Sequence, residues 1–323
     1  MDDSQWLLEA EPWTAYRTRL DLLHEDPGSP KVQDAYDRMI RDPKITDLLV
    51  DLEKWPGEVL KSHKKAGHLL HKLVFIADLG LRLDHPQVAV LLDKVFSLAS
   101  EEGPFRIVVN LPKHFGGSGE DELSWMLCDA GSTLYAAAKL GGTEDPRTIK
   151  AADTLAGLAQ DEIGWPCAAT KALGNFKGPG KREDPCPYVN LLMIKALQPF
   201  GERYRHQINL GVNTLLRLWE RRRSQKPFLF AMGTHFAKLK APFVWYDILH
   251  VMDVLSQITE VHDERPVREM AEIIGGKADS QVRFTPESIW MDWRDWDFGQ
   301  KREPSRWLTF LAWRILDRIN QPI

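Results

Sequence analysis

The amino-acid sequence repeats a pattern about every 60 residues, and this period constrains the fold more than any local motif does. In each copy an apolar segment ends at a short polar turn, an amphipathic segment follows, and a long connection leads to the next copy. Asp84, Asp145 and Asp263 occupy equivalent places in three of these turns and are separated by 61 and 118 residues, one period and two. Because a single helix pair cannot bury its own apolar face, stacked copies must continue as a solenoid or close into a ring.

The apolar segments predict six inner helices, at residues 12–23, 66–81, 122–140, 187–199, 243–258 and 304–320. The segments that follow the turns at 83–88, 144–149, 201–206 and 262–267 predict outer helices. In these turns an acidic residue followed by proline or a charged residue is typical of a helix N-terminus, where the acid caps exposed amides. Six pairs are enough to close a ring. We therefore predict an all-α fold, an (α/α)6 toroid with inner and outer helix rings and long loops on one rim, forming a single domain over residues 1–323.

An open superhelix of helical repeats is the alternative architecture. Such repeats usually have a shorter period of about 34 to 47 residues and short loops. Here the connections from an outer helix to the next inner helix run about 20 residues, and loops of that length are uncommon unless they serve a function. The sequence therefore favours the closed ring.

Composition and charge exclude several classes of protein. The net charge is −4, which gives no electrostatic reason to expect nucleic-acid binding. No apolar run reaches the roughly 18 residues of a transmembrane helix, and the acidic start at Met1, Asp2 and Asp3 differs from the basic start of a signal peptide. The three cysteines are too few, and odd in number, for a disulfide framework. These features predict a cytoplasmic protein with no transmembrane segment and no nucleic-acid partner.

Several short motifs are similar to those of known protein families. The segment from Gln160 to Trp165 is similar to the Gln-x-x-x-Gly-x-Trp repeat motif of squalene and hopene cyclases, one residue shorter. Further similar segments are Gly164-Trp-Pro-Cys167, Asp184-Pro-Cys-Pro-Tyr-Val-Asn190, Pro242-Phe-Val-Trp-Tyr-Asp247 and Pro304-Ser-Arg-Trp-Leu-Thr309. With the period and the order of the helix pairs, the chain resembles the terpenoid cyclase and protein prenyltransferase superfamily, most closely bacterial and archaeal prenyltransferase or squalene-oxidase repeat proteins. This resemblance implies an α/α toroid and an isoprenoid or other amphipathic ligand in its cavity.

Two departures from the family patterns matter for the chemistry. Class II cyclases protonate their substrate with an Asp-x-Asp-Asp motif, and the nearest run here is Trp290-Met-Asp-Trp-Arg-Asp-Trp-Asp297, which argues against squalene cyclization. Protein prenyltransferase β subunits bind zinc through an Asp-x-Cys pair and a distant histidine. Asp184-Pro-Cys186 matches the first part of that pattern, with His235 or His250 as candidate partners, but the rest of the family's histidine motif is not recognisable.

The residues themselves also predict a zinc site. In a closed ring the inner helices run in the same direction, so their N-termini share one rim. Cys128 is expected in the first turns of the third inner helix, Cys186 at the start of the fourth, and Cys167 in the loop between them. Zinc favours tetrahedral sulfur and nitrogen ligands. The predicted ligands are Cys128, Cys167, Cys186 and His235, with Asp184, Asp247 and His250 as alternates. The alternative is that the cysteines pack as small buried apolar residues. His63, His68 and His71 cluster around the second inner helix, and we expect His68 and His71, which share a face, to pack or to be solvated rather than to bind metal.

The same rim is expected to bind the ligand. Helix N-termini together with basic loop residues could hold an anionic head group; these residues are Lys181, Arg182, Lys238, Lys240, Arg302 and Arg306. Aromatic faces can line an apolar cavity or stabilise a cation. The candidate ligand-binding residues are Trp125, Tyr188, Trp245, Tyr246, Arg306 and Trp307. The alternatives are that the basic residues are solvated and that the tryptophans belong to the core.

Three aspartates are candidate catalytic acids: Asp292 and Asp295, which alternate with tryptophans between Trp290 and Asp297, and Asp247. A carboxyl group held against aromatic rings has a raised pKa and can act as an acid. An exposed lid whose tryptophans clamp the surface is equally consistent with the Trp290–Asp297 segment.

Three hypotheses for function follow, and the sequence leaves open whether the protein is an enzyme. The first is a prenyltransferase-like or cyclase-like enzyme that acts on an isoprenoid or other amphipathic substrate, assisted by zinc. The second is a non-catalytic toroid that binds a ligand or a partner protein. The third is a zinc-dependent enzyme that transfers an alkyl group to a thiol on a small substrate. Fold alone does not choose among them, because function depends on the site.

Overall fold

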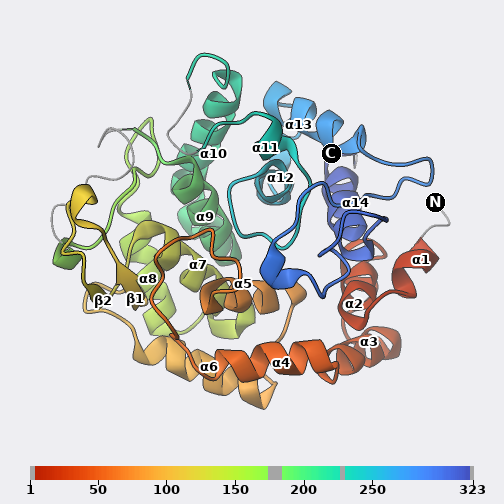
Figure 1. Cartoon of the computed structure of the whole chain (residues 1–323), viewed down its shortest axis with the longest axis horizontal. Coiled ribbons are helices and arrows are strands. Elements are labelled where there is room, and N and C mark those ends of the chain that lie inside the picture. Colours follow the sequence, from red (N-terminus) through yellow and green to blue (C-terminus); the bar gives the residue numbers. More distant parts are fainter. Residues whose placement is uncertain (1–3, 174–183, 226–229, 321–323) are drawn as a thin grey trace. The chain divides into compact units, whose positions relative to one another are not determined.

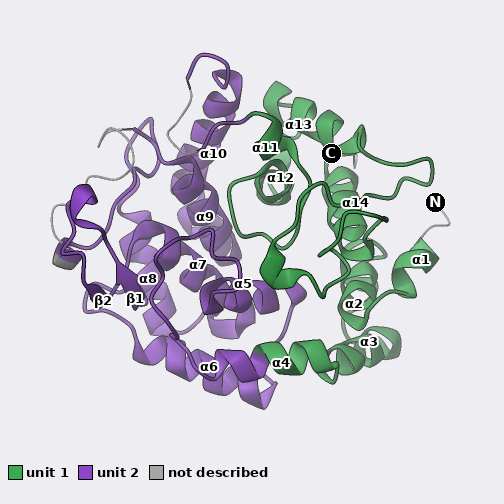
Figure 2. Ribbon diagram, viewed as in Figure 1, with its two compact units in different colours: residues 1–48, 233–323 green, residues 49–232 purple. Residues whose placement is uncertain are grey.

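The computed structural model describes residues 4–173, 184–225 and 230–320 and is mainly helical (Figure 1). The chain groups into two compact units (Figure 2). Unit 1 comprises residues 1–48 and 233–323, so it is built from both ends of the sequence, and unit 2 comprises residues 49–232. The mainly α-helical class predicted from the sequence is confirmed.

The helices are α1 (Ser4–Leu8), α2 (Pro12–Asp21), α3 (Pro30–Ile40), α4 (Pro43–Leu52), α5 (Leu69–Leu79), α6 (Pro86–Ser97), α7 (Leu127–Ala137), α8 (Pro146–Ala156), α9 (Pro187–Leu197), α10 (Arg205–Glu220), α11 (Thr234–Ala237), α12 (Ile248–Leu255), α13 (Arg265–Gly275) and α14 (Arg306–Asn320). Shorter helical turns are η1 (Lys113–Phe115), η2 (Ala138–Gly142), η3 (Lys171–Leu173), η4 (Gln198–Tyr204), η5 (Thr259–Val261) and η6 (Met291–Trp293). A single pair of strands, β1 (Ile107–Asn110) and β2 (Asp121–Ser124), completes the described elements.

All six predicted inner helices are present as α2, α5, α7, α9, α12 and α14, which we call the first helices. The helices that follow them in the predicted pairs are α3, α6, α8, α10 and α13, which we call the second helices. In unit 2, α7 packs against both α5 and α9, and in unit 1, α14 packs against both α12 and α2. Each unit therefore holds three first helices packed as neighbours.

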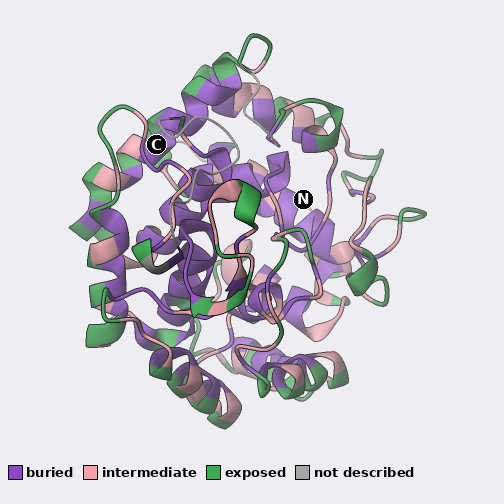
Figure 3. Cartoon of the chain, turned by 60° about the vertical axis from the view of Figure 1, so that its left-hand side comes forward, coloured by how far each residue is buried: buried purple, intermediate pink, exposed green. Residues whose placement is uncertain are grey.

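Burial separates the two kinds of helix as the sequence predicts. Every residue of α7, α9 and α12 is buried, because these helices are covered on several sides. The second helices bury one face: in α13 the buried residues are Pro266, Val267, Met270, Ala271 and Ile274, which recur at helical spacing. The remaining faces of such helices are exposed or half-buried (Figure 3).

The second helices begin where the polar turns place them, but the capping is only partly as expected. Asp145 is the N-cap of α8 and accepts a hydrogen bond from the amide of Arg147 at 2.8 Å. At α6 and α13 the N-cap residues are His85 and Glu264, and neither side chain makes a cap hydrogen bond. The prediction that Asp84 and Asp263 cap these helices is therefore wrong, because in each case the N-cap position falls on the next residue. A proline in the first turn favours the helix start at both places.

A β-hairpin corrects the all-α prediction. β1 and β2 pair antiparallel, with Ile107 opposite Ser124 and Asn110 opposite Asp121. The β-branched residues of β1 alternate between buried and half-buried positions, as the two faces of a strand require. The predicted helix start at residue 122 is therefore wrong, because the residues before α7 pair with β1 and the helix begins at Leu127.

One position in the C-terminal part of the first five first helices, and in the middle of α14, carries a polar residue, at spacings of 57, 57, 60, 58 and 61 residues. These residues form what we call the polar tier: Asp21, Asp78, Tyr135, Lys195, Asp253 and Arg314. In unit 2 the Asp78 carboxylate accepts from the Tyr135 hydroxyl at 2.6 Å and pairs with the Lys195 ammonium at 2.9 Å. In unit 1 the Arg314 guanidinium pairs with Asp21 at 2.9 Å and with Asp253 at 2.6 Å. Equivalent residues of three neighbouring helices thus bond to one another within each unit.

Among the described helices, none is both long enough and apolar enough to cross a membrane.

Candidate metal centre

The three cysteines lie in unit 2 in the places that the sequence predicts. Cys128 is in the first turn of α7, and Cys186 is the N-cap residue of α9, directly before Pro187. Cys167 lies in the segment between α8 and α9. Electrostatic interactions link Cys128 with Cys186 and Cys167, so the cysteines gather in one region of the unit.

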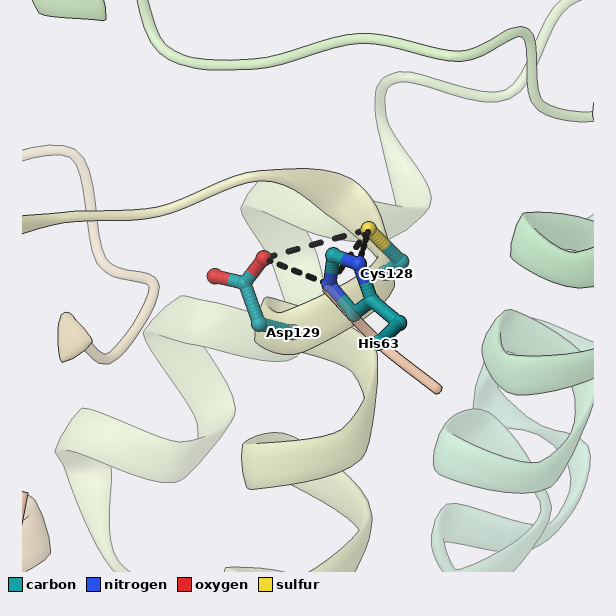
Figure 4. Close-up of side chains that lie close together, drawn as sticks. All are labelled: His63, Cys128 and Asp129. Carbon is teal, nitrogen blue, oxygen red and sulfur yellow. Dashed lines mark hydrogen bonds and ion pairs between the residues drawn. The ribbon is translucent and has the colours of Figure 1, made fainter. Parts of the chain in front are cut away.

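Cys128 contacts two other side chains of types that can bind a metal (Figure 4). Its Sγ lies 3.0 Å from Nε2 of His63 and 3.8 Å from Oδ1 of Asp129. The same His63 Nε2 lies 3.4 Å from Asp129 Oδ1. These three donor atoms all lie within 4.8 Å of one another, and we call His63, Cys128 and Asp129 the metal triad.

The local structure holds each member of the triad in place. Asp129 Oδ2 accepts a hydrogen bond from the Met126 amide at 3.0 Å, which closes the N-terminus of α7 and leaves Oδ1 for the triad. The backbone carbonyl of His63 contacts Nε2 of His71 at 2.8 Å, which fixes the segment before α5. The His63 ring meets the edge of the Tyr188 ring at a centroid distance of 6.3 Å. Asp129 and Cys128 are buried, and the His63 side chain is 15% exposed, so the triad remains accessible on one side.

The geometry fits a metal better than it fits a cysteine nucleophile. In a catalytic triad the acid orients one ring nitrogen while the nucleophile contacts the other. Here Cys128 and Asp129 approach the same nitrogen of His63. Burial and the Asp129 carboxylate also raise the pKa of the Cys128 thiol, which opposes thiolate formation in the absence of a cation. The three donor atoms instead lie as close to one another as ligands of one ion could.

The spacing of the donors is compatible with zinc. Zinc bonds of about 2.3 Å to sulfur and about 2.0 Å to nitrogen or oxygen place tetrahedral donors about 3.3 to 3.6 Å apart. The nitrogen–oxygen and sulfur–oxygen distances in the triad, 3.4 Å and 3.8 Å, lie close to that range, and the sulfur–nitrogen distance of 3.0 Å is shorter. A small displacement of the His63 ring would accommodate the ion.

Sequence reasoning overlooked His63. It clusters with His68 and His71, which are buried and contact backbone carbonyls through Nε2. No sequence pattern places His63 beside Cys128; the packing of α5 against α7 brings a residue just before α5 near the first turn of α7.

The other predicted ligands lie elsewhere. Asp184 is exposed in unit 2, and His235 is exposed on α11 in unit 1. His250 is buried in unit 1, where its Nδ1 contacts the carbonyl of Trp245 at 3.1 Å. Metal binding by these residues, by Asp247 and by the remaining cysteines stays a prediction.

The predicted catalytic acids differ in environment. Asp247 is buried and caps α12, accepting from the His250 amide at 3.1 Å, and Lys240 lies 3.7 Å from its other oxygen. Burial raises the pKa of Asp247 to about 6. Asp292 and Asp295 are exposed, whereas the neighbouring Asp297 accepts from the Ser305 hydroxyl and has a pKa raised by burial. The raised pKa expected in this segment therefore belongs to Asp297.

Most of the predicted ligand-binding residues pack in the core of their own unit. Trp125 donates to the Glu102 carboxylate at 3.0 Å, Tyr246 packs on Phe236, and Trp307 packs on Phe310. Arg306 donates to the carbonyl of Glu9 at 3.0 Å, and Trp245 is half-buried. Tyr188 lies beside the metal triad and stacks on Phe230.

The structure describes only some of the basic residues that the sequence predicts on the ligand-binding rim. Lys181 and Arg182 lie outside the described residues. Lys240 contacts Asp247 and places its ammonium group 4.3 Å from the centre of the Trp290 ring. Lys238 is half-buried and Arg302 is exposed.

Comparison with known proteins adds no assignment: no protein-family model matches the chain, and no curated protein matches its sequence.

Proposed function

We propose that unit 2 binds a zinc ion through His63, Cys128 and Asp129, and that the protein is a zinc-assisted transferase acting on an isoprenoid or other amphipathic substrate. The observation that carries the proposal is the convergence of a thiol and a carboxylate on one imidazole nitrogen, at 3.0 Å and 3.4 Å. Three protein ligands leave the fourth position of a tetrahedral zinc ion open, which is typical of catalytic rather than structural sites.

The charges of the triad support a cation. Cys128 and Asp129 are adjacent in sequence and both buried, so two negative charges would repel each other there. A divalent ion removes this penalty, because a coordinating thiol is deprotonated outright. Zinc bound here would supply a Lewis acid and would activate a thiol or water at its open position.

The surroundings of the triad support an apolar or amphipathic substrate. Tyr188 contacts the His63 ring and also the Phe230 ring, which stacks on it at 6.4 Å with an interplanar angle of 20°. Such aromatic surfaces line apolar ligand sites and attract a developing cation. Transfer of an alkyl group to the thiol of a small substrate needs the same metal and remains the alternative chemistry.

We also propose that the six first helices, with the second helices that follow five of them, close into the (α/α)6 toroid expected from the sequence. Three features support closure: the repeat period, the three neighbouring first helices in each unit, and the polar tier, whose members recur at nearly equal spacing through all six first helices. A closed ring would place the triad at the rim formed by the N-termini of the first helices. It would also provide the cavity for the substrate.

Metal analysis of the purified protein tests the proposal. We expect about one zinc ion per chain after incubation with zinc and removal of the excess. Cys128→Ser and His63→Ala should each lose most of this metal, because each removes one of three ligands. Matched controls are Cys167→Ser and His114→Ala, which change the same residue types outside the triad and should retain it. Circular dichroism verifies that each variant is folded.

The outcomes separate the three hypotheses. Folded wild-type protein that binds no zinc would refute the proposal and favour the non-catalytic toroid. Equal loss of zinc in Cys167→Ser and Cys128→Ser would move the site to the other cysteines. Zinc-loaded protein that is stabilised by an isoprenoid diphosphate, but not by a small thiol, supports the isoprenoid substrate over the small one.

A further inference from the structure

His63 comes from an irregular segment, whereas Cys128 and Asp129 lie on α7 (Figure 4). Residues 58–63, which we call the His63 segment, belong to no helix, and among them only Leu60 is buried. Apolar packing therefore holds the segment at one point. The position of the His63 ring depends on the hydrogen bonds that the backbone of the segment makes.

Two buried imidazoles bind the ends of the His63 segment. At its start, the carbonyl of Glu58 contacts Nε2 of His68 at 2.9 Å. At its end, the carbonyl of His63 contacts Nε2 of His71 at 2.8 Å. A carbonyl oxygen only accepts, so each Nε2 carries a proton and donates it. Nδ1 of His68 accepts from the Leu70 amide at 3.1 Å, as this tautomer requires. Both imidazoles belong to the N-terminus of α5, so one helix holds both ends of the segment.

The β-hairpin connects the His63 segment to the α7 side of the metal triad. The Leu60 amide donates to the carbonyl of Val108 at 2.8 Å, and Leu60 forms a parallel bridge with Val109, so the segment runs along β1. β2 pairs with β1 and ends shortly before α7 begins. The hairpin therefore joins the two sides of the triad, and the two imidazoles fix the ends of the segment that carries His63.

We propose that His68 and His71 are positioning residues of the zinc site, whose imidazoles hold the His63 segment so that the His63 ring reaches Cys128 and Asp129. This inference rests on the proposed zinc site and adds to it two residues outside the triad. Groups that orient a metal ligand typically contribute about 10- to 100-fold to metal affinity. His71 should contribute more than His68, because it binds the carbonyl of the ligand residue itself.

The zinc affinity of full-length variants, measured by competition with a chromophoric chelator, tests the proposal. His71→Leu removes the donor and should weaken zinc binding by about 10- to 100-fold. His71→Gln keeps an N–H group near the place of Nε2 and should bind zinc with nearly the affinity of the wild type. The absorption spectrum of bound Co²⁺ should change in His71→Leu, because displacement of His63 distorts the coordination geometry, and should be restored in His71→Gln.

His262 supplies a matched control. It is buried in unit 1, and its Nε2 contacts the carbonyl of Ser256 at 2.9 Å, so His262→Leu removes the same kind of contact outside the metal triad. Zinc affinity and the Co²⁺ spectrum should be unchanged in this variant. Equal loss of affinity in His262→Leu and His71→Leu would overturn the proposal, because it would reflect general destabilisation. If His71→Leu does not fold, His71→Phe, which keeps a ring without the donor, takes its place.

A measurement on chelator-treated protein separates this inference from the proposed function. The His63 ring lies against Cys128, with Nε2 3.0 Å from Sγ. Brief alkylation of the native protein, followed by peptide mapping, should label Cys128 faster in His71→Leu than in the wild type and should label Cys167 at the same rate in both. Wild-type labelling of Cys128 together with wild-type zinc affinity in folded His71→Leu would overturn the inference. Wild-type protein that binds no zinc would refute the proposed function, and the labelling of Cys128 would still decide whether His71 positions His63.

Discussion

At the scale of single residues, Asp247 combines a structural role with an electrostatic cost. Its side chain caps α12, but burial disfavours its charged form and raises its pKa to about 6. The Lys240 ammonium at 3.7 Å offsets only part of this cost. The residue predicted as a catalytic acid therefore carries a proton at a pH where an exposed aspartate does not.

The raised pKa of Asp247 predicts in which direction the free energy of unfolding changes with pH. Between about pH 4 and pH 6 the folded protein binds a proton at Asp247 that the unfolded chain has lost, so the free energy of unfolding falls as pH rises. Burial of the charged carboxylate destabilises the folded protein fully at a pH above the pKa of Asp247 in the folded state, and not at all below its pKa in the unfolded chain. A difference of about two pKa units corresponds to about 3 kcal/mol in the free energy of unfolding. Asp247→Asn keeps an oxygen for the cap and should remove this pH dependence, as measured by urea unfolding across the same range.

The exposed Asp292 supplies the control for this measurement. Asp292→Asn should leave the pH profile of unfolding as it is in the wild type. A profile for Asp247→Asn that equals the wild-type profile would show that Asp247 ionises normally when buried.

At the scale of elements, the polar tier joins helices that are far apart in sequence. In unit 2, Lys195 of α9 pairs with Asp78 of α5, and its ammonium group lies 4.4 Å from the centre of the Tyr135 ring of α7. The Lys195 side chain is 3% exposed and that of Asp78 is 9% exposed. A buried pair of this kind fixes which helix faces meet, even where its net contribution to stability is small.

Lys195→Met should destabilise unit 2 by about 3 to 5 kcal/mol, because it leaves the Asp78 carboxylate buried without its cation. The measurement is the urea midpoint of unfolding. Lys61→Met changes the same residue type on the surface and should shift stability by less than about 0.5 kcal/mol. Adding Asp78→Leu to Lys195→Met should recover much of the loss. Equal midpoints for Lys61→Met and Lys195→Met would mean that the pair contributes nothing.

At the scale of the whole molecule, the discontinuity of unit 1 is the main feature. The N-terminal α2 packs against the C-terminal α14, and Asp21 of α2 is one of the two carboxylates that neutralise the buried Arg314. The two ends of the chain thus complete a single packed unit, whereas unit 2 is continuous in sequence.

Deleting residues 4–22 should therefore disturb unit 1 far more than unit 2. Removal of α1 and α2 uncovers α14 and leaves Arg314 with one of its two carboxylates. Hydrogen exchange by mass spectrometry should show faster amide exchange in α12 and α14, with α7 and α9 still protected. Equal loss of protection in all four helices would indicate that the units unfold as one.

Much of the helical framework could be predicted because it depends on local and periodic signals. The apolar segments marked all six first helices, and proline and polar turns marked the second helices near their observed starts. The hairpin before α7 was missed, because strands of four residues have no periodic signal strong enough to compete with an adjacent apolar helix.

The sequence by itself determined the helix pairs, their period and the positions of the three cysteines relative to the first helices. Only the tertiary structure decided which side chains meet, because contacts between elements depend on packing that no local pattern encodes. It brought His63 to Cys128 from 65 residues away. It also showed that the polar residues one period apart bond to one another within each unit. The repeat thus indicated where equivalent residues recur, and packing decided which of them interact.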